Sequence, residues 1–142
     1  MNINGKKALI LGIANKHSIA YGIAKTLSEQ GAELAISYAV PTLAKRVLPI
    51  AEELGIDMVY ECDLSKDNDI KNMMSLIAEV WDHIDFIVHS VAFAPSSDLN
   101  IPFHHTSRHG FLTAMDISVY SLLAVSREAE MLLRPGSSII TL

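Results

Sequence analysis

The sequence predicts an α/β protein built on a doubly wound parallel sheet, and two observations lead to this prediction. Short apolar runs alternate with longer stretches of helical periodicity along the chain, which is the pattern of βαβ units with right-handed crossovers. Half of the 142 residues are hydrophobic and only 19% are charged, which suits a sheet that is covered on both faces. This length corresponds to one domain with a sizeable core.

Five short apolar runs, each beside a helical stretch, are the expected strands. We expect them to pair in the order 3-2-1-4-5, and the last has the composition of a buried strand. They are Lys7–Gly12, Glu33–Tyr38, Asp57–Glu61, Phe86–Ser90 and Ser138–Leu142.

The first helix follows the first strand. Ser18 is its candidate N-cap, and Gly31 is expected to end it. The apolar residues Ile19, Ile23 and Leu27 recur on it at intervals of four. This spacing places them on one side of the helix.

Three further helices are expected. The second begins near Thr42 and ends at Gly55, and Pro49 should kink or split it because an interior proline costs about 3 kcal/mol. The third runs from about Asp67 to Trp81 and carries a buried stripe of Ile70, Met73, Met74, Ile77 and Val80. The longest follows the segment Ala92–Ser107, spans about His109–Leu133, and is stopped by Pro135 and Gly136.

Charge and composition exclude several classes of function. A net charge of −5 and a pI near 5.6 argue against a nucleic-acid partner or an anionic membrane. No apolar stretch approaches the roughly 20 residues of a membrane span. The single cysteine, Cys62, excludes an internal disulfide, so we expect a soluble protein in the reducing cytoplasm.

The turn after the first strand indicates a phosphate site, although it lacks the G-x-G-x-x-G fingerprint. Gly12 allows a sharp turn, Ala14 keeps the loop small, and Ser18 and Ile19 offer N–H groups at a helix start that carries no acid. Gly22 would let the helix approach the sheet closely. Glycine at a βα turn can also be required by the backbone conformation alone. By itself, the turn therefore leaves open whether it binds a nucleotide or is only a structural turn.

Two other strand ends favour a ligand at this edge. In a doubly wound sheet, ligands lie at the carboxyl ends of the strands where the order reverses, here between the first and fourth strands. Asp63 follows the third strand, where its carboxylate could bind an adenine amino group; on its own, a role as turn or cap residue explains it better. After the fourth strand, Ser90, Val91 and Ala92 form a run of small residues beside a flat cofactor.

The end of the second strand bears on the choice of cofactor. A carboxylate there would read the ribose 2′-hydroxyl and an arginine the 2′-phosphate, but the segment Ser37–Pro41 has neither. The lack of a cation favours NADH over NADPH. Lys45 and Arg46 lie one turn into the next helix, and whether they reach back stays open.

Two patterns are better explained without catalysis or metal binding, and a third is left open. Tyr21 and Lys25 have Y-x3-K spacing, but on the first helix this is a chance pair. His105 and His109 have one-face helical spacing beside His104 without the intervening glutamate of H-E-x-x-H, so solvated histidines are expected and no metal. Asp116 and Ser118 on the long helix could be functional or could serve a surface or interface.

The chain resembles the NADH-dependent enoyl-acyl carrier protein reductases of bacterial fatty acid synthesis, which belong to the short-chain dehydrogenase/reductase superfamily. The resemblance covers essentially the whole chain and rests on the long G-x5-S-x3-G turn Gly12–Gly22, on Cys62–Leu64 and on Val88–Pro95. Asp116–Ser118 and Pro135–Ser137 match as well. A Rossmann-like fold is implied, of which residues 1–142 would be the N-terminal part of a single dinucleotide-binding reductase domain.

The resemblance implies roles for individual residues. Gly12, Ser18 and Ile19 would contact the pyrophosphate. Asp63 and Leu64 would hold the adenine, and Val91 would lie by the nicotinamide. Phe93 and Ala94 would border the acyl substrate. Ala39 departs from the glutamine that similar enzymes often carry, which puts ribose recognition there in doubt, and Pro49 departs from a helix usually free of proline.

The implied reaction transfers a hydride from NADH to a trans-2-enoyl thioester on acyl carrier protein, in a homotetramer built partly on the long helix. In the family, a Y-x6-K pair follows the fifth strand, and we expect it beyond Leu142, with the sheet cut off before its remaining strands and helices. The chain alone is therefore expected to be inactive. The alternatives are a non-catalytic nucleotide-binding module and one half of a two-chain reductase.

Overall fold

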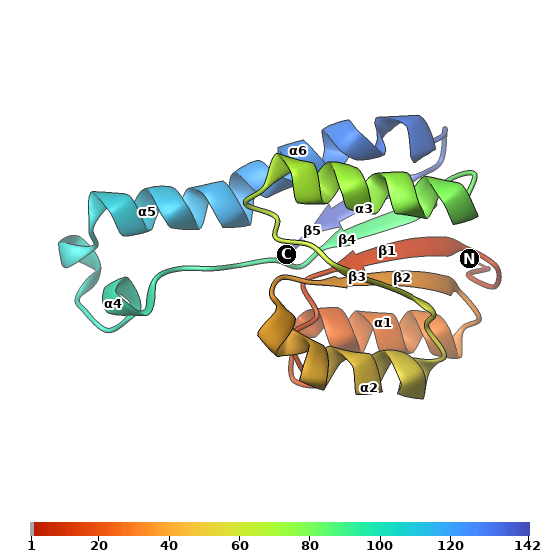
Figure 1. Cartoon of the computed structure of the whole chain (residues 1–142), viewed down its shortest axis with the longest axis horizontal. Helices are drawn as coiled ribbons and strands as arrows, with labels where there is room; N and C mark the ends of the chain where they lie inside the picture. Colours follow the sequence, from red (N-terminus) through yellow and green to blue (C-terminus); the bar gives the residue numbers. More distant parts are fainter. Residues whose placement is uncertain (1) are drawn as a thin grey trace.

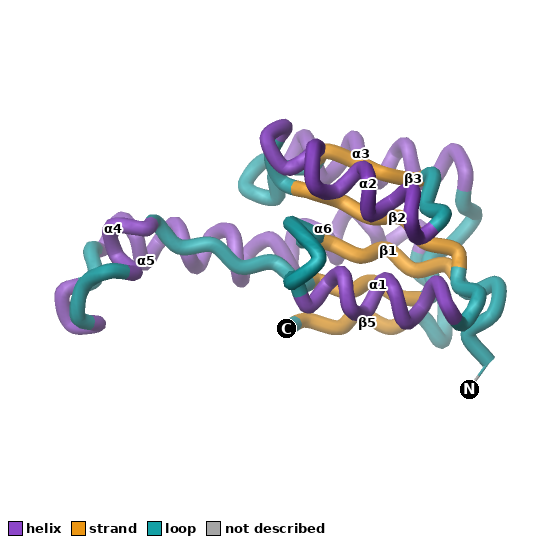
Figure 2. The backbone as a smooth tube through the Cα atoms, turned by 90° about the horizontal axis from the view of Figure 1, so that it is seen from below, coloured by secondary structure: helices purple, strands orange, loops and turns teal. Residues whose placement is uncertain are grey.

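The computed structural model describes residues 2–142 and contains a five-stranded parallel sheet in the order β3-β2-β1-β4-β5. Figure 2 shows the strands side by side. Fold class and strand order are confirmed, and each strand ends within one residue of its predicted bounds. The strands are β1 (Lys7–Leu11), β2 (Glu33–Tyr38), β3 (Met58–Glu61), β4 (Phe86–His89) and β5 (Ser138–Thr141).

Helices cover both faces of the sheet (Figure 1). On one face, α1 (Ile19–Glu29) and α2 (Ala44–Leu54) enclose a core that includes Ile10 and Ile36. On the other face, α3 (Asp67–Val80) and α6 (Ser121–Ala129) enclose a second core. Because the central strands are buried on both sides, the apolar composition of the chain is accounted for.

An arm projects beyond the sheet, as Figures 1 and 2 both show. It consists of α4 (Ser96–Leu99) and α5 (Arg108–Met115), which are joined through the short helix η2 (Phe103–His105). The helix α5 continues through a π-helical turn, η3 (Asp116–Tyr120), into α6 and the short η4 (Glu130–Leu132). The single long helix that the sequence predicts is therefore present, with a change of register inside it.

The first helix packs only partly as predicted, because Ile23 and Leu27 are half-buried against the core but Ile19 is not. Its fully buried residues are Ala20 and Ala24, whereas Ile19 is 66% exposed. A Cβ at Gly22 would meet no atom within 4 Å, so the expected close approach at Gly22 is wrong. The two alanines, with a methyl group as their whole side chain, are the residues that bring α1 close to the sheet.

The expectation that Pro49 splits the second helix is wrong, because α2 continues through it. Pro49 is exposed, while Val47 and Ile50 on the same helix are buried against the sheet. One missing N–H on the solvent side leaves a carbonyl that water can satisfy. The helix begins after η1 (Pro41–Leu43) and ends at Gly55 in the left-handed conformation.

One expectation about burial is wrong at the edge of the fold. Val80, at the last position of α3, is 64% exposed, although the rest of the predicted stripe is buried. All four residues of β5 are exposed, although the strand has the composition of a buried one. Among the described strands β5 pairs with β4 alone, so one of its edges remains open.

No helix between residues 2 and 142 has both the length and the apolar character needed to cross a membrane.

Two aspartates join β1 to the loop before β4 at the amino end of the sheet. The Asp85 carboxylate accepts the Lys7 backbone N–H at 2.9 Å and the Lys6 ammonium at 3.0 Å. Asp82 accepts the Lys7 ammonium at 2.7 Å and the Arg134 guanidinium at 2.8 Å. Burial raises the pKa of Asp85, but these hydrogen bonds outweigh it and the pKa is lowered. The Lys7 hydrogen bond and His83 lower the pKa of Asp82.

We predict that the free energy of unfolding falls as the pH drops below the ordinary aspartate pKa of 3.8. Both folded-state pKa values lie below the unfolded ones, so the stabilisation is complete above that pH and is lost as the pH falls toward the folded values. Thermal unfolding from about pH 6 to about pH 2.5 measures this. Asp85→Asn should flatten the dependence, whereas Asp57→Asn, at an exposed position, should not; equal dependence in Asp85→Asn and the wild type contradicts the prediction.

Candidate functional site

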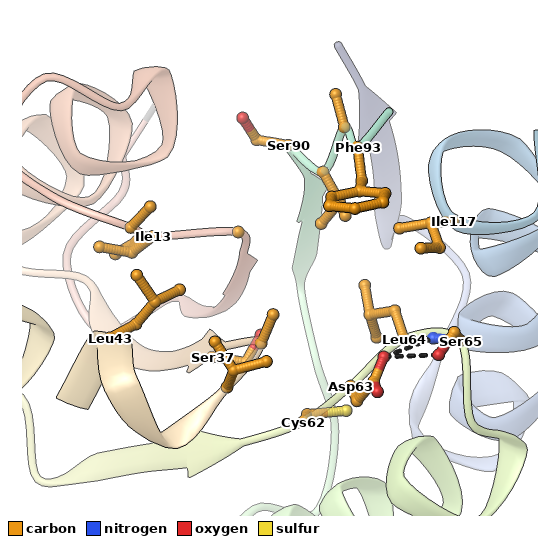
Figure 3. A pocket seen from close by; sticks show the side chains of 16 residues that line it. Ile13, Ser37, Leu43, Cys62, Asp63, Leu64, Ser65, Ser90, Phe93 and Ile117 are labelled. Atoms are coloured by element: carbon orange, nitrogen blue, oxygen red, sulfur yellow. Dashed lines mark hydrogen bonds between the residues drawn. The ribbon is translucent and has the colours of Figure 1, made fainter. Parts of the chain in front are cut away.

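A cleft of about 440 Å³ lies across the carboxyl ends of β1, β2, β3 and β4. Figure 3 shows the side chains that line it, with Ile13 and Leu43 facing Phe93 and Ile117 across the opening. The position is the switch point of the strand order, where α/β sheets bind ligands. The cleft includes nine residues named from the sequence, which are Gly12, Ala14, Ala39, Asp63, Leu64, Ser90, Val91, Ala92 and Phe93.

The structure does not bring every predicted site residue into the cleft. Ser18, Ile19 and Ala94 lie outside its lining. Ser18 occupies the N-cap position of α1, but its hydroxyl donates to the Asn15 carbonyl at 2.6 Å rather than capping the helix. Ile19, the first residue of α1, points largely to solvent.

Gly12 lies where the turn after β1 passes closest to the end of β4. Its φ is +96°, a conformation that favours glycine, and a Cβ there would lie 2.0 Å from the Ser90 carbonyl oxygen. Just before and after Gly12, the Leu11 carbonyl accepts the Ser90 N–H at 3.2 Å and the Ile13 N–H donates to the Ser37 carbonyl at 3.3 Å. The turn after β1 is therefore held between the ends of β4 and β2.

The start of α1 suits an anion. Its first turn has no acidic residue, and Ser18 makes no side-chain hydrogen bond to it. Lys16 in the preceding turn pairs with Glu53 of α2, and Asn15 accepts the His17 N–H at 2.7 Å. Because these contacts fix the turn, the N–H groups and positive dipole end of α1 have a defined position.

Asp63 performs the turn role that the sequence left open. Its Oδ1 accepts the backbone N–H of Ser65 at 3.1 Å and the Ser65 hydroxyl at 2.7 Å, drawn as dashed lines in Figure 3. Burial raises the pKa of Asp63, but the Ser65 hydrogen bonds and Lys66 outweigh it and the pKa is lowered. The carboxylate therefore stays ionised at neutral pH, and it has lone pairs left for a ligand.

The floor and one wall of the cleft are residues that sequence reasoning missed. Burial raises the pKa of the Cys62 thiol to about 12, so it is a neutral lining group. Val40 and Leu43 reach the cleft because η1 folds back after β2, which the sequence did not predict. The other missed lining residues are Ile13, Ser37, Ser65 and Ile117.

The far end of the cleft is formed by Phe93 and the π turn η3. The Ser118 hydroxyl accepts the Phe93 N–H at 3.1 Å and lies 3.4 Å from the Phe93 carbonyl, while Ile117 lines the cleft. Ser118 could have been found from the sequence, where it was one of two polar residues noted on the long helix. Nothing in the pattern signals a π turn, so Ile117 could not.

The patterns set aside in the sequence lie away from the cleft. The Tyr21 hydroxyl donates to Glu53 at 3.4 Å, and Lys25 pairs with Glu29. Tyr38 and Lys45 also have Y-x6-K spacing, but they follow β2 and neither lines the cleft. The His104 and His105 rings lie side by side on the arm, with centroids 4.3 Å apart. In the described chain, no cluster of three or more His, Cys, Asp or Glu is placed to hold a metal ion.

Comparison with known proteins gives consistent matches. A sequence model described as "Enoyl-(Acyl carrier protein) reductase" matches residues 12–142. An enoyl-[acyl-carrier-protein] reductase [NADH] of Aquifex aeolicus is 53% identical over 126 residues, which are 89% of this chain and 47% of that protein. The corresponding reductase 1 of Rhizobium meliloti is 45% identical over 140 residues, covering 99% of this chain and 52% of its own length.

Solved structures agree with these matches. A crystal structure of the Aquifex aeolicus reductase superposes with a TM-score of 0.94 at 49% identity, covering 99% of this chain and 56% of that one. A reductase of Anaplasma phagocytophilum, crystallised in complex with NAD, superposes with a TM-score of 0.92 at 44% identity. The match covers 99% of this chain and 54% of that one. The chain thus spans about half the length of the relatives it matches.

Proposed function

The chain belongs to the enoyl-(acyl carrier protein) reductase family, and we propose that its cleft binds NADH across the carboxyl ends of β1 to β4. One observation carries the proposal: the turn at Gly12 meets the end of β4 so closely that no side chain fits between them. In dinucleotide-binding folds, glycine in the turn after the first strand allows the tight turn and a close approach of the backbone to the pyrophosphate.

We assign the two halves of the cofactor by the chemistry of the walls. The turn from Gly12 and the uncapped start of α1 suit the pyrophosphate. Val40, Leu43 and Leu64 offer an apolar slot for the adenine, with the ionised Asp63 beside it to accept an amino group. Ser90 and Val91 then border the nicotinamide half, and Phe93 and Ala94 the substrate.

In the whole protein, we propose reduction of a trans-2-enoyl thioester carried on acyl carrier protein, in the cytoplasm and in a homo-oligomer. Bound NADH would supply the hydride. The residues described here bind and orient the cofactor and keep water from one side of it. No tyrosine or lysine of residues 2–142 lines the cleft, so we expect the 142-residue chain to bind NADH without turning over substrate.

Calorimetric titration tests the binding proposal. We expect a micromolar dissociation constant for NADH and weaker binding of NADPH, because the wall at Ala39 and Val40 carries no cation for the 2′-phosphate. Asp63→Ala should weaken NADH binding, and Ala39→Arg should improve NADPH binding, while His105→Ala on the arm should change neither.

Two results would contradict the proposal. The first is no NADH binding by a folded chain. The second is equal binding of NADH by Asp63→Ala and the wild type, which would remove Asp63 from the adenine site. Absorbance at the NADH band with crotonyl thioester tests the expected lack of turnover, and steady NADH oxidation would overturn it.

A further inference from the structure

His89 is a fully buried polar side chain with no role in the binding scheme above. It is the last residue of β4 and comes directly before the lining residues Ser90 and Val91. Its Nδ1 lies 3.3 Å from the Thr141 hydroxyl of β5, and its Nε2 lies 2.7 Å from the Ser121 hydroxyl of α6. A buried imidazole without such partners would be costly, so its contacts determine its role.

The hydrogen bonds run in one direction. The Ser121 hydroxyl donates its proton to the Ile117 carbonyl at 2.6 Å, so its oxygen must accept from His89 Nε2–H. The Nδ1 atom is then the acceptor, and the Thr141 hydroxyl donates to it. Burial lowers the pKa of His89, which agrees with a neutral ring in the Nε2–H form.

The chain of bonds ends at the π turn. The Ser121 backbone N–H donates to the Asp116 carbonyl, five residues back, and not to the Ile117 carbonyl that an α-helix would use. The Ser121 hydroxyl satisfies that carbonyl instead. The changed register carries Ile117 to the cleft wall and Ser118 to the backbone of Phe93.

We propose that His89 is a positioning residue, which through Ser121 holds the π turn Asp116–Tyr120 in the register that closes the far end of the cofactor cleft. This role rests on the proposed function, because the ligand whose binding would respond is NADH. No atom of His89 needs to touch that ligand. The imidazole acts on the cleft through Ile117 and Ser118.

Three variants test the role by calorimetric titration with NADH. His89→Leu removes both hydrogen bonds and replaces the imidazole with an apolar side chain that can fill the buried space, and it should weaken binding about tenfold. His89→Gln keeps an amide N–H that can reach Ser121 and should restore binding to within about threefold of the wild type. Ser121→Ala should match His89→Leu. Ser126→Ala is the control, since Ser126 makes the same bond to a carbonyl four residues back without touching His89.

Near-UV circular dichroism of the buried Trp81 shows whether each variant is folded. A second readout needs no ligand, because long-range ¹H–¹⁵N spectra of the wild type report the tautomer of His89. We expect protonated Nε2 and bare Nδ1, and loss of this single form in Ser121→Ala. The Nδ1–H tautomer in the wild type would overturn the proposal.

The titrations separate the two proposals. Full NADH affinity in a folded His89→Leu chain would overturn the role of His89 alone. If His89→Gln binds NADH no better than His89→Leu, the role of His89 is likewise overturned. Absence of NADH binding by the wild type would overturn the proposed function and the role that rests on it.

Discussion

Replacing Gly12 by alanine is expected to destabilise the chain by about 3 kcal/mol and to abolish NADH binding. The new Cβ would lie 2.0 Å from the Ser90 carbonyl oxygen and 2.8 Å from its carbon, which are backbone atoms that cannot rotate away. The φ of +96° adds strain of its own. The turn and the end of β4 must separate, and this widens the cleft where the pyrophosphate would lie.

Gly55→Ala is the matched control for this change. Gly55 also has a positive φ, +66°, but a Cβ there meets nothing within 4 Å. The backbone strain alone should cost about 1 kcal/mol and leave NADH binding unchanged. Chemical denaturation measures the stability of both variants, and calorimetry measures the binding. Equal losses at the two positions would show that the contact with Ser90 is not what requires glycine.

Replacing Ala24 by leucine is expected to cost about 1–3 kcal/mol of stability and to weaken NADH binding as well. Ala24 is fully buried between α1 and the sheet, and the larger side chain has no space unless the helix moves outward. Because the start of α1 is part of the proposed phosphate site, this movement should reach the ligand.

Gly22→Ala on the same helix is the control. Its added methyl group meets no atom within 4 Å, and alanine favours a helix over glycine by about 0.5–1 kcal/mol, so stability should rise. Thermal unfolding and NADH titration of the two variants give the comparison. If Ala24→Leu unfolds at the wild-type temperature, the alanines do not set the distance of α1 from the sheet.

The alternation of strands and helices was predictable from the sequence. Strands and helices alternate with clear apolar periods, so the order and bounds of the strands followed from local pattern and general rules for parallel sheets. The small residues Gly12 and Ala14 and the strand ends at Asp63 and Ser90 marked the cleft for the same reason. The carboxyl ends of parallel strands lie at the same end of the sheet, whatever other contacts each strand makes.

The parts that depend on tertiary contacts were not predictable. Which residues of α1 are fully buried depends on the space under the helix, which Ala20 and Ala24 fill while Ile19 is left exposed. Pro49 is tolerated because it faces water, which spacing alone does not show. Ile117 reaches the cleft through a π turn that is held by a histidine 28 residues earlier in the chain, and no local pattern contains that bond.

The pairing of β1 with β4 has a consequence for the order of folding. The first strand occupies the centre of the sheet, yet its bond from the Lys7 N–H reaches Asp85, 78 residues later. During synthesis, β1, β2 and β3 emerge before β4, so β2 can pair with one side of β1 and β3 with β2, with α1 and α2 packed over them. The other side of β1 has no partner until β4 leaves the ribosome, so any sheet that forms before then has an open edge at the strand that later becomes central.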